Sequence, residues 1–275
     1  MPSFFNYFKK IKYYLIRNIE TIPLINILIL NNLYYFRYFL PHDKDYLGIK
    51  NLNLPSGLDI IDVGANIGAS FLSFKSLKLK NKIHCFEPNP ILVKEKLNFL
   101  KKKYTNLSVY NVALGKKNVI GTFFLPYYKN KPLHYFASFD KQYVINSCKI
   151  TFSKNYLNKI HLIEKKVKLK KLDDYQKIIK PIFIKIDTEG FDLDVILGAT
   201  KIIKKHKPIL LIEYNSDIIL KIKKKLPNYS LFYYDFIKDK FFKLKTNNIN
   251  KDLISRHNKK NHFSYRNLYF IPNKR

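Results

Sequence analysis

The residues best suited to chemistry begin in a short segment between an apolar run and a helical pattern. Residues 62–68 read Asp-Val-Gly-Ala-Asn-Ile-Gly. Gly64 and Gly68 allow a tight turn and a close approach of the backbone to a ligand, and the helix that follows presents free N–H groups there. We therefore predict a ligand-binding loop, with a purely structural turn as the alternative.

The loop differs from those that bind dinucleotides. Its glycines have the spacing GxxxG instead of the GxGxxG of pyrophosphate-binding loops. Asp62 precedes the loop, and a third glycine is missing. An acid at that place suits a ligand with a cationic amino acid moiety better than a pyrophosphate.

A second acid, Glu87, ends the next apolar run, about 20 residues downstream of the loop. An acid in this position can accept hydrogen bonds from both ribose hydroxyls of an adenosine group. Pro88 and Asn89 then turn the chain, so that the carboxylate can face the cleft. The loop and Glu87 together indicate an adenosyl ligand.

Acidic residues also follow the strand predicted at residues 182–186. Asp187 and Glu189 come directly after it, and Glu213 ends the next predicted strand. In an open α/β sheet, ligands bind beyond the carboxyl ends of the strands. We expect these acids to face one cleft and Asp187 and Glu189 to handle a proton. The alternative for Asp187 is that it caps the helix that follows.

These segments alternate in a way that is typical of a parallel sheet. Short β-rich runs alternate with helical patterns from residue 58 onward, as in repeated βαβ units. We expect an α/β fold with a doubly wound, mostly parallel sheet, closed by a C-terminal antiparallel pair of strands. The predicted strands are residues 59–63, 82–86, 107–114, 182–186, 208–212, 231–236 and 268–271, and the predicted helices are residues 64–80, 91–104 and 191–205.

The sequence carries a large positive charge. It has 51 Lys and Arg against 20 Asp and Glu, a formal net charge of +31. Such an excess favours anionic partners, such as nucleic acid, an anionic membrane leaflet or an acidic glycan. The basic residues are scattered, however, so the codon bias of a very AT-rich genome explains the excess as well.

The two cysteines, Cys85 and Cys148, form no CxxC pair and no metal-ligand spacing. We therefore expect no disulfide framework and no metal site, and a cytoplasmic compartment fits best.

Two N-terminal segments bear on membrane contact. Polar residues interrupt the apolar segment at 22–40, so we predict that it is not a transmembrane helix. Lysines and aromatic residues alternate over residues 4–17. They predict either an amphipathic helix on an anionic membrane, peripheral to the inner membrane surface, or a helix packed on the domain's own edge.

Seven blocks of the sequence resemble the FkbM-type methyltransferases. They occur in the family's order over about residues 58–215, and the combination is far more specific than a single glycine motif. The resemblance implies a class I methyltransferase (Rossmann-like) fold, S-adenosylmethionine as donor, and O-methylation of sugars in surface glycans or of hydroxyls in natural products. Where the family often has Gly-Phe-Glu, this chain has Asp192. The blocks are DVGANIG at 62–68, FEPNP at 86–90, NVALG at 111–115, KLDD at 171–174, KIDTEGFD at 185–192, LGA at 197–199 and PILLIEYN at 208–215.

The resemblance also implies roles for individual residues. Glu87 would bind the ribose diol, and the segment from Asn111 to Ala113 would flank adenine. Asp187 and Glu189 would lie near the transferred methyl group, and Ser138 near the acceptor. The residues implied in donor binding are Asp62, Gly64, Asn66, Gly68, Glu87, Asn111 and Ala113.

The expected domain organisation has three parts. A helical extension at residues 1–57 precedes a methyltransferase domain at 58–275, in which the alternation breaks down over about 119–166. This insertion is rich in aromatic residues and holds a candidate hairpin around Gly121. Long insertions often carry function, so we predict that it forms the acceptor pocket or a lid.

Methyl transfer to a hydroxyl requires an aligned acceptor and removal of its proton. Alignment contributes up to about 7–11 kcal/mol, and a general base about 10²- to 10⁴-fold. We predict Glu189 or Asp187 as the base. His134 is a second candidate, although a lone histidine is more often structural. Ser138, His134 and Glu213 are the residues expected on the acceptor side.

Two other functions are compatible with parts of the sequence. The charge would suit an RNA methyltransferase, but the Asn-Pro-Pro-Tyr motif of base methylation is absent and a lysine-rich ribose-methylation tetrad finds no clear match. A noncatalytic module that docks on anionic membranes or polymers is disfavoured by the intact acids. We therefore expect a small-molecule or glycan acceptor as partner, with contact to an anionic membrane as an option and nucleic acid disfavoured.

Overall fold

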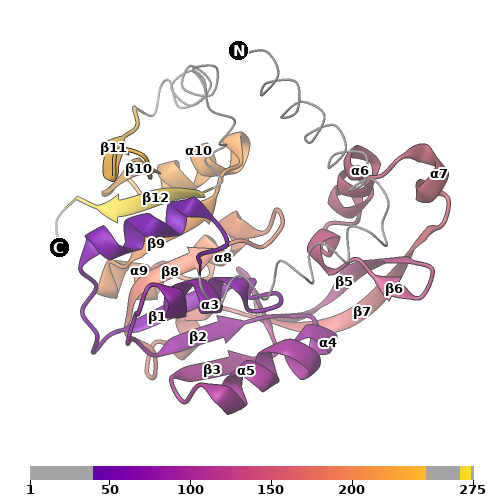
Figure 1. The fold of residues 1–275 in the computed structure, drawn as a ribbon, viewed down its shortest axis with the longest axis horizontal. Coiled ribbons are helices and arrows are strands. Elements are labelled where there is room, and N and C mark those ends of the chain that lie inside the picture. Colours follow the sequence, from indigo (N-terminus) through magenta and orange to yellow (C-terminus); the bar gives the residue numbers. More distant parts are fainter. Residues whose placement is uncertain (1–39, 246–266, 274–275) are drawn as a thin grey trace, which may run out of the picture. The chain divides into compact units, whose positions relative to one another are not determined.

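The computed structural model describes residues 40–245 and 267–273 (Figure 1). The described residues divide into two compact units: 40–121 with 167–245 and 267–273, and 122–166. We call them the larger and the smaller unit. Most of the N-terminal predictions, including the segment at 4–17, lie outside the described residues. Within the described ranges, no helix is both long and apolar enough to cross a membrane.

The larger unit is built on an eight-stranded sheet with the order β11-β10-β12-β9-β8-β1-β2-β3. β1, β2, β3, β8 and β9 run parallel, and β12, β10 and β11 pair antiparallel beside β9. The predicted doubly wound α/β sheet with C-terminal antiparallel strands is confirmed, and β11 is an additional strand. The strands are β1 (Asp59–Val63), β2 (Ile83–Phe86), β3 (Leu107–Tyr110), β8 (Pro181–Ile186), β9 (Ile209–Glu213), β10 (Tyr229–Asp235), β11 (Lys240–Lys243) and β12 (Asn267–Pro272).

The strand order reverses between β1 and β8. From β1 the chain builds outward through β2 and β3, and it then returns to place β8 and β9 on the other side of β1. Such a switch point leaves a crevice beyond the carboxyl ends of the two central strands, where ligands of doubly wound sheets bind.

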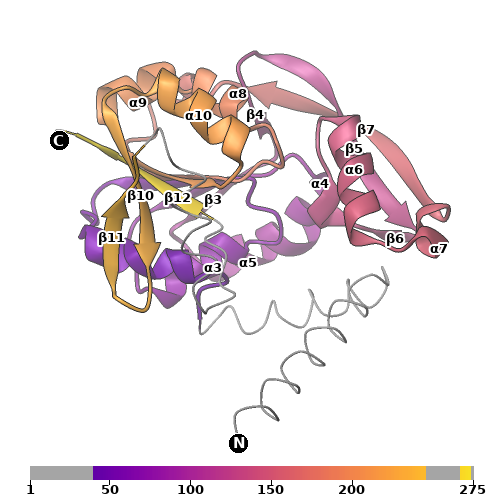
Figure 2. The ribbon, with the colours of Figure 1, turned by 90° about the horizontal axis from the view of Figure 1, so that it is seen from above.

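Helices cover both faces of this sheet (Figure 2). All six residues of β8 and all four of β2 are buried, which is why these strands read as nearly continuous apolar runs. The helical segments of the larger unit are η1 (Lys44–Leu52), α3 (Ala69–Ser76), α4 (Pro90–Leu92), η2 (Val93–Leu97), α5 (Asn98–Lys103), η4 (Leu172–Tyr175), α8 (Asp192–Leu197), α9 (Thr200–His206) and α10 (Ser216–Lys225).

The single strand predicted at 107–114 is wrong. β3 ends at Tyr110, and β4 (Ala113–Leu114) pairs with β7 in a second sheet. Between them the Asn111 side chain donates hydrogen bonds to the carbonyl oxygens of Glu87 and Pro88, at 2.9 and 3.1 Å. This side chain therefore binds the turn after β2 at the point where the chain leaves the first sheet.

The single helix predicted at 191–205 is also wrong, because α8 and α9 are separate. Gly198 lies so close to Gly115 that a Cβ there would overlap the Gly115 carbonyl oxygen. The Asp173 carboxylate then accepts hydrogen bonds from the backbone N–H groups of Lys201 and Ile202, at 3.1 and 2.9 Å. The Asp173 side chain, which lies outside α9, thus caps the N-terminus of this second helix.

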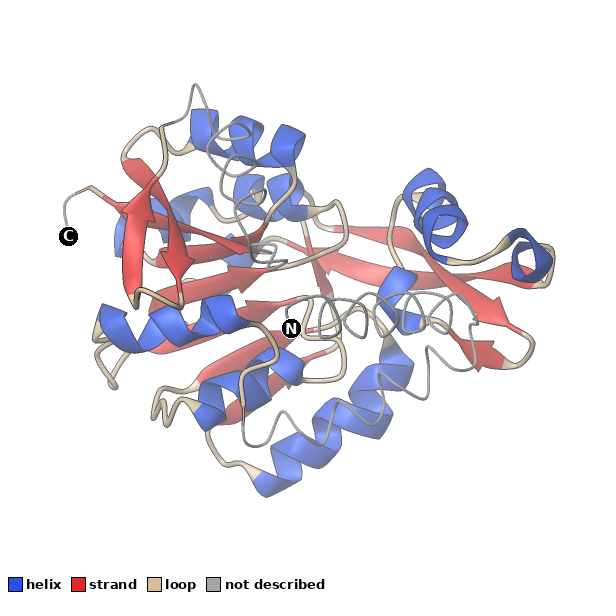
Figure 3. Cartoon of the chain, turned by 45° about the horizontal axis from the view of Figure 1, so that its top comes forward, coloured by secondary structure: helices blue, strands red, loops and turns tan. Residues whose placement is uncertain are grey.

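The described part of the smaller unit belongs to a four-stranded sheet with the order β4-β7-β5-β6, whose strands β5 and β7 continue from the larger unit. Two helices lie on one side of its strands (Figure 3), and α6 packs Val144 and Cys148 against Tyr128 and Leu133. The elements are β5 (Val119–Tyr128), β6 (Lys131–Pro132), η3 (His134–Phe136), α6 (Lys141–Thr151), α7 (Lys154–Leu157) and β7 (Ile160–Lys170).

The hairpin predicted around Gly121 is displaced. Gly121 lies inside β5, and the reversal comes after Tyr128, which pairs with Lys131 of β6. Lys129 adopts the left-handed conformation that the turn requires, with φ of 54°. The glycine was a misleading signal because it occupies a strand position.

Candidate functional site

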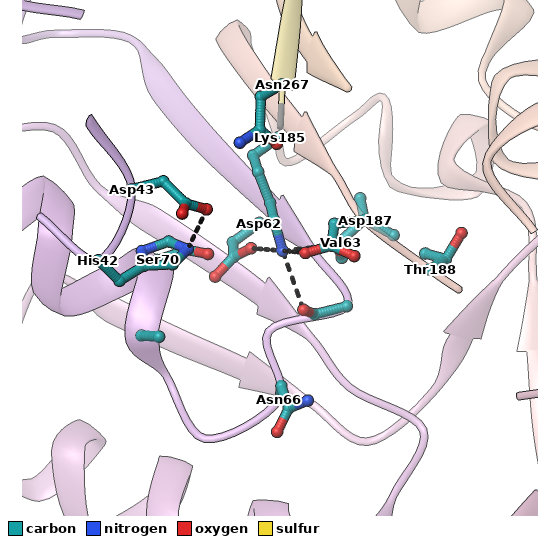
Figure 4. Close-up of polar contacts among 12 residues, drawn as sticks. His42, Asp43, Asp62, Val63, Asn66, Ser70, Lys185, Asp187, Thr188 and Asn267 are labelled. Carbon is teal, nitrogen blue, oxygen red and sulfur yellow. Dashed lines mark hydrogen bonds and ion pairs between the residues drawn. The ribbon is translucent and has the colours of Figure 1, made fainter. Parts of the chain in front are cut away.

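A buried lysine joins the carboxyl ends of the two central strands (Figure 4). Lys185 of β8 is 2% exposed, and its Nζ lies 3.2 Å from Asp62 Oδ1 and 3.5 Å from Asp187 Oδ2. Nζ also donates to the carbonyl oxygens of Gly64, at 3.0 Å, and Val63, at 3.4 Å. The parallel register, in which Asp62 stands beside Lys185, produces this arrangement.

The charges of this cluster compensate one another. Burial by itself lowers the pKa of Lys185, but the carboxylates of Asp62 and Asp187 outweigh that effect and the pKa is raised well above its ordinary value. Burial raises the pKa of Asp62, and the ammonium of Lys185 opposes the rise. The lysine is therefore charged at neutral pH.

Gly64 and Gly68 each have a structural reason to be glycine. Gly64 has a φ of 74°, and a Cβ there would overlap the carbonyl oxygen of Asp187. Gly68 has a φ of 84°, and a Cβ there would press on the side chain of Leu100 in α5. The loop at 62–68 is thus packed tightly between β8 and α5.

Glu87 meets this loop directly. Its Oε2 accepts a hydrogen bond from the Asn66 N–H at 2.8 Å, and its Oε1 accepts one from the Asn89 N–H at 2.8 Å. Burial raises the pKa of Glu87 to about 7, although the two N–H donors work against the rise. The side-chain Oδ1 of Asn66 is buried and has no hydrogen-bond partner within the described parts of the chain.

The predicted acids influence one another at the ends of β8 and β9. Burial, followed by the charges of Asp187, Glu189 and Asp192, raises the pKa of Glu213 to about 9. This shift favours the protonated form of Glu213 at neutral pH. The carboxyl of Asp187 is 33% exposed and so remains accessible from solvent.

A comparison with protein families identifies the family of this chain. A family model described as the methyltransferase FkbM domain matches residues 62–243. The chain belongs to the FkbM methyltransferase family. The match runs from Asp62 through the acidic segment after β8 and ends at the last residue of β11.

Two solved structures are similar to this FkbM-family chain. A crystal structure of the methyltransferase FkbM from Methylobacillus flagellatus KT is 17% identical, with a TM-score of 0.49 over 90% of this chain and 52% of that one. The chain thus spans about half the length of the Methylobacillus protein. The precorrin-6y C5,15-methyltransferase from Geobacter metallireducens GS-15 is 11% identical, with a TM-score of 0.38 over 82% and 84% of the two chains. A comparison with curated proteins found no match.

The alternative that Asp187 caps the following helix is wrong. The N-cap residue of α8 is Phe191, and its side chain makes no capping hydrogen bond. Asp187 instead faces Lys185. Asp192 organises the segment that joins Asp187 to α8. Its Oδ1 accepts hydrogen bonds from the N–H and the hydroxyl of Thr188, at 3.0 and 2.8 Å. Burial raises the pKa of Asp192 to about 6.

The other residues that are predicted to bind the methyl donor contact neighbouring groups of the protein itself. Asp62 is fully buried and lies against Lys185 and the Cys85 thiol. The Asn111 amide binds the turn after Glu87, and Ala113 is buried in β4. Contacts of these residues with a donor stay a prediction.

Ser138 and His134 belong to the smaller unit. Ser138 is 1% exposed, and its Oγ accepts a hydrogen bond from the Asp140 N–H at 3.2 Å. Its backbone pairs with Phe124 of β5. His134 begins the short helix η3. The proposed acceptor-side roles of both residues stay predictions.

Sequence reasoning missed the roles of Lys185 and Asp192. Lys185 carried a signal, since it is the charged residue in the otherwise apolar strand Pro-Ile-Phe-Ile-Lys-Ile. A charge on a strand buried on both faces must find partners. The only sequence signal at Asp192 was that the family often has glutamate at this position.

Two further observations limit the site. No three His, Cys, Asp or Glu side chains within the described ranges are arranged to hold a metal ion. A cavity of about 770 Å³ lies elsewhere in the larger unit, between the region of α8 and α9 and the turn from α10 into β10. None of the predicted site residues lines it.

Proposed function

We propose that the chain is an S-adenosylmethionine-dependent O-methyltransferase whose acceptor is a sugar hydroxyl of a bacterial surface glycan or of its precursor. The observation that carries the proposal is the meeting of Glu87 with the loop after β1, at the switch point of the sheet. The hydrogen bond from the Asn66 N–H to Glu87 Oε2, 2.8 Å long, joins the two motifs that together indicate an adenosyl ligand.

The residues present fit this donor. Glu87 has oxygen lone pairs left for ribose hydroxyls after binding two N–H groups. The buried Oδ1 of Asn66 has no partner in the described structure and is suited to accept a hydrogen bond from a ligand. The acids after β8 favour a cation nearby. When bound, S-adenosylmethionine supplies a methyl group activated by a positively charged sulfur.

The chain's own contribution is to orient the acceptor and accept its proton. In O-methylation the hydroxyl oxygen would form the new bond to the methyl carbon as the carbon–sulfur bond breaks and the sulfur leaves as a neutral thioether, and the hydroxyl proton would pass to a base. We assign that role to Asp187 or Glu189. Glu213, whose raised pKa favours the protonated form at neutral pH, is not assigned this role.

The family and the charge support the proposed acceptor. FkbM-type enzymes usually methylate sugars or natural-product hydroxyls, and a formal net charge of +31 favours an anionic acceptor. We place the protein in the cytoplasm, with residues 4–17 contacting the inner surface of an anionic membrane.

Calorimetry with S-adenosylmethionine tests the donor. We expect binding with 1:1 stoichiometry to the full chain, and no heat would overturn the proposal.

The acceptor is tested with methyl-labelled donor and a panel of sugars, nucleotide-linked sugars, glycan fractions and RNA. We expect label in the glycan arm, with an O-methyl signal by NMR after purification. Label in RNA alone would overturn the assigned acceptor while leaving the donor assignment intact. Separate D187N and E189Q variants identify the base, and full turnover by both folded variants would exclude this assignment.

A further inference from the structure

The charge of Lys185 is costly where it lies. The residue is 2% exposed in a strand whose other five members are also buried. An ammonium group loses its hydration there, and a well-packed apolar side chain of similar volume would often be no less stable. A charge in this place therefore calls for a reason other than stability.

The contacts of Lys185 divide between two segments. On one side are Asp62 Oδ1 and the carbonyl oxygens of Val63 and Gly64, at 3.2, 3.4 and 3.0 Å. On the other side is Asp187 Oδ2 at 3.5 Å. The first segment is the loop that the proposed function assigns to the methyl donor, and the second holds a carboxylate that it assigns to proton removal.

The backbones of the two segments touch at the same place. The Asp187 N–H donates to the Val63 carbonyl oxygen at 3.2 Å, and Gly64 leaves no room for a Cβ against the Asp187 carbonyl. The ammonium of Lys185 has three N–H groups to share among these oxygens. It therefore adds side-chain bonds to both segments where their backbones already meet.

We propose that Lys185 is a positioning residue that fixes the Asp187 carboxylate relative to the donor loop at Gly64. It acts through these two groups without touching the acceptor. This inference rests on the proposed function for its catalytic consequence, but the order that Lys185 imposes on the two segments is independent of it.

A simple substitution would confuse positioning with stability. K185M leaves the fully buried Asp62 without its counter-ion, and an unpaired buried charge is strongly destabilising. The informative variant is K185M/D62L, which replaces the ion pair by apolar side chains of similar shape. Its matched control is D62L, in which Lys185 still faces Asp187 and the carbonyl of Gly64. K177M, at an exposed lysine, controls for the loss of one positive charge.

The first readout is hydrogen exchange of the ligand-free protein, measured by mass spectrometry. We expect amides of residues 63–68 and 187–190 to exchange at least ten-fold faster in K185M/D62L than in D62L. Exchange in β2 and β9 should be unchanged. Equal protection of the two segments in both variants would overturn the proposal. If K185M/D62L does not fold, K185Q/D62L takes its place against the same D62L control, because the glutamine amide keeps donors for the carbonyls but carries no charge.

The second readout is steady-state kinetics with the identified acceptor at saturating S-adenosylmethionine, because Asp62 is itself predicted to bind the donor and D62L weakens that binding in both variants. We expect kcat to fall at least ten-fold from D62L to K185M/D62L, with a smaller change in the KM for the acceptor. Adding D187N to both variants should remove most of that difference, because Lys185 would no longer have the carboxylate to position. An undiminished difference in the D187N background would show that Lys185 does not act through Asp187.

The two failures are distinguishable. If the wild-type protein neither binds S-adenosylmethionine nor transfers methyl groups, the proposed function fails, and hydrogen exchange still decides whether Lys185 orders the two segments. If the wild-type protein is active and the exchange rates do not separate the variants, only the role of Lys185 fails.

Discussion

In the role proposed for it, Glu87 is held in place by backbone contacts before the donor binds. Two backbone N–H groups, from Asn66 and Asn89, hold its oxygens at 2.8 Å. Burial nevertheless raises the pKa of Glu87 to about 7, so that the protonated and ionised forms are balanced near neutral pH. In the proposed role, Glu87 accepts hydrogen bonds from ribose hydroxyls most strongly when it is ionised, and donor affinity should therefore depend on pH.

We expect the affinity for S-adenosylmethionine to fall as the pH is lowered from 8 to 6. A raised carboxyl pKa means that Glu87 is ionised above pH 7 and protonated below it. Hydrogen bonds to a charged acceptor contribute about 1.5–3 kcal/mol, so E87Q should weaken binding by about 10- to 100-fold at pH 8 and flatten its pH dependence. Calorimetry at pH 6, 7 and 8 measures both effects. E95Q, at an exposed position, should behave like the wild type, and a wild-type affinity that is flat over this range would contradict the role of Glu87.

Glu213 should influence stability in the opposite sense to an ordinary paired carboxylate. Its pKa is raised to about 9, so the folded protein binds this proton more tightly than the unfolded chain does. The corresponding stabilisation is present below about pH 4.5 and is lost as the pH rises toward 9. E213Q cannot ionise and should be more stable than the wild type at pH 9, by about 1–3 kcal/mol, and nearly equal to it at pH 5. Urea denaturation at both pH values tests this, and a variant that is less stable at pH 9 would refute it.

At the scale of elements, the breaks between helices and strands depend on contacts from distant parts of the chain. α8 and α9 separate because Gly198 packs on the backbone of Gly115 and because Asp173 caps the second helix. None of these partners is close to Gly198 in the sequence. The break also fixes the end of α8, the helix that follows the acidic segment after β8.

Gly198 should tolerate no side chain. Its φ of −89° is ordinary, so the effect of G198A is steric and not conformational. A Cβ there would overlap the Gly115 carbonyl oxygen, and overpacking of this kind costs about 1–3 kcal/mol or more. Urea denaturation of G198A measures the loss. G57A is the matched control because nothing lies within 4 Å of a Cβ at Gly57, and equal stability of the two variants would contradict the packing described.

The difference between local sequence patterns and contacts from distant parts of the chain explains which elements could be predicted from the sequence. β1, β2, β8 and β9 were predicted because strands buried on both faces are apolar runs ended by glycine, proline or acid. The meeting of Glu87 with the loop followed from the topology of parallel strands. The division of residues 107–114 was missed because it depends on hydrogen bonds from Asn111 to the turn after β2. The contacts of Lys185 and Asp192 were missed for a similar reason, since partners in space leave no periodic pattern.

For the whole molecule, the net charge of +31 is the property with the widest reach. Charge spread over the entire surface attracts any anionic partner, whereas charge next to aromatic residues can place a segment on a membrane. Residues 4–17, which lie outside the described structure, combine Lys9, Lys10 and Lys12 with Phe4, Phe5 and Phe8. Attraction by the net charge of the whole molecule and attraction by residues 4–17 should respond differently to substitution.

We expect the full chain to bind vesicles that contain anionic lipid and to leave neutral vesicles unbound. Each lysine near an anionic surface contributes about 1 kcal/mol, so K9Q/K10Q/K12Q should weaken binding and reduce its dependence on salt. F4S/F5S/F8S should weaken binding at every salt concentration, because burial of an aromatic side chain among lipids is insensitive to screening. K201Q/K204Q/K205Q, in α9, removes the same charge elsewhere and is the control. Sedimentation with vesicles distinguishes the cases. If K9Q/K10Q/K12Q and K201Q/K204Q/K205Q lose the same amount of binding and F4S/F5S/F8S loses none, the net charge of the molecule is responsible and residues 4–17 have no special role.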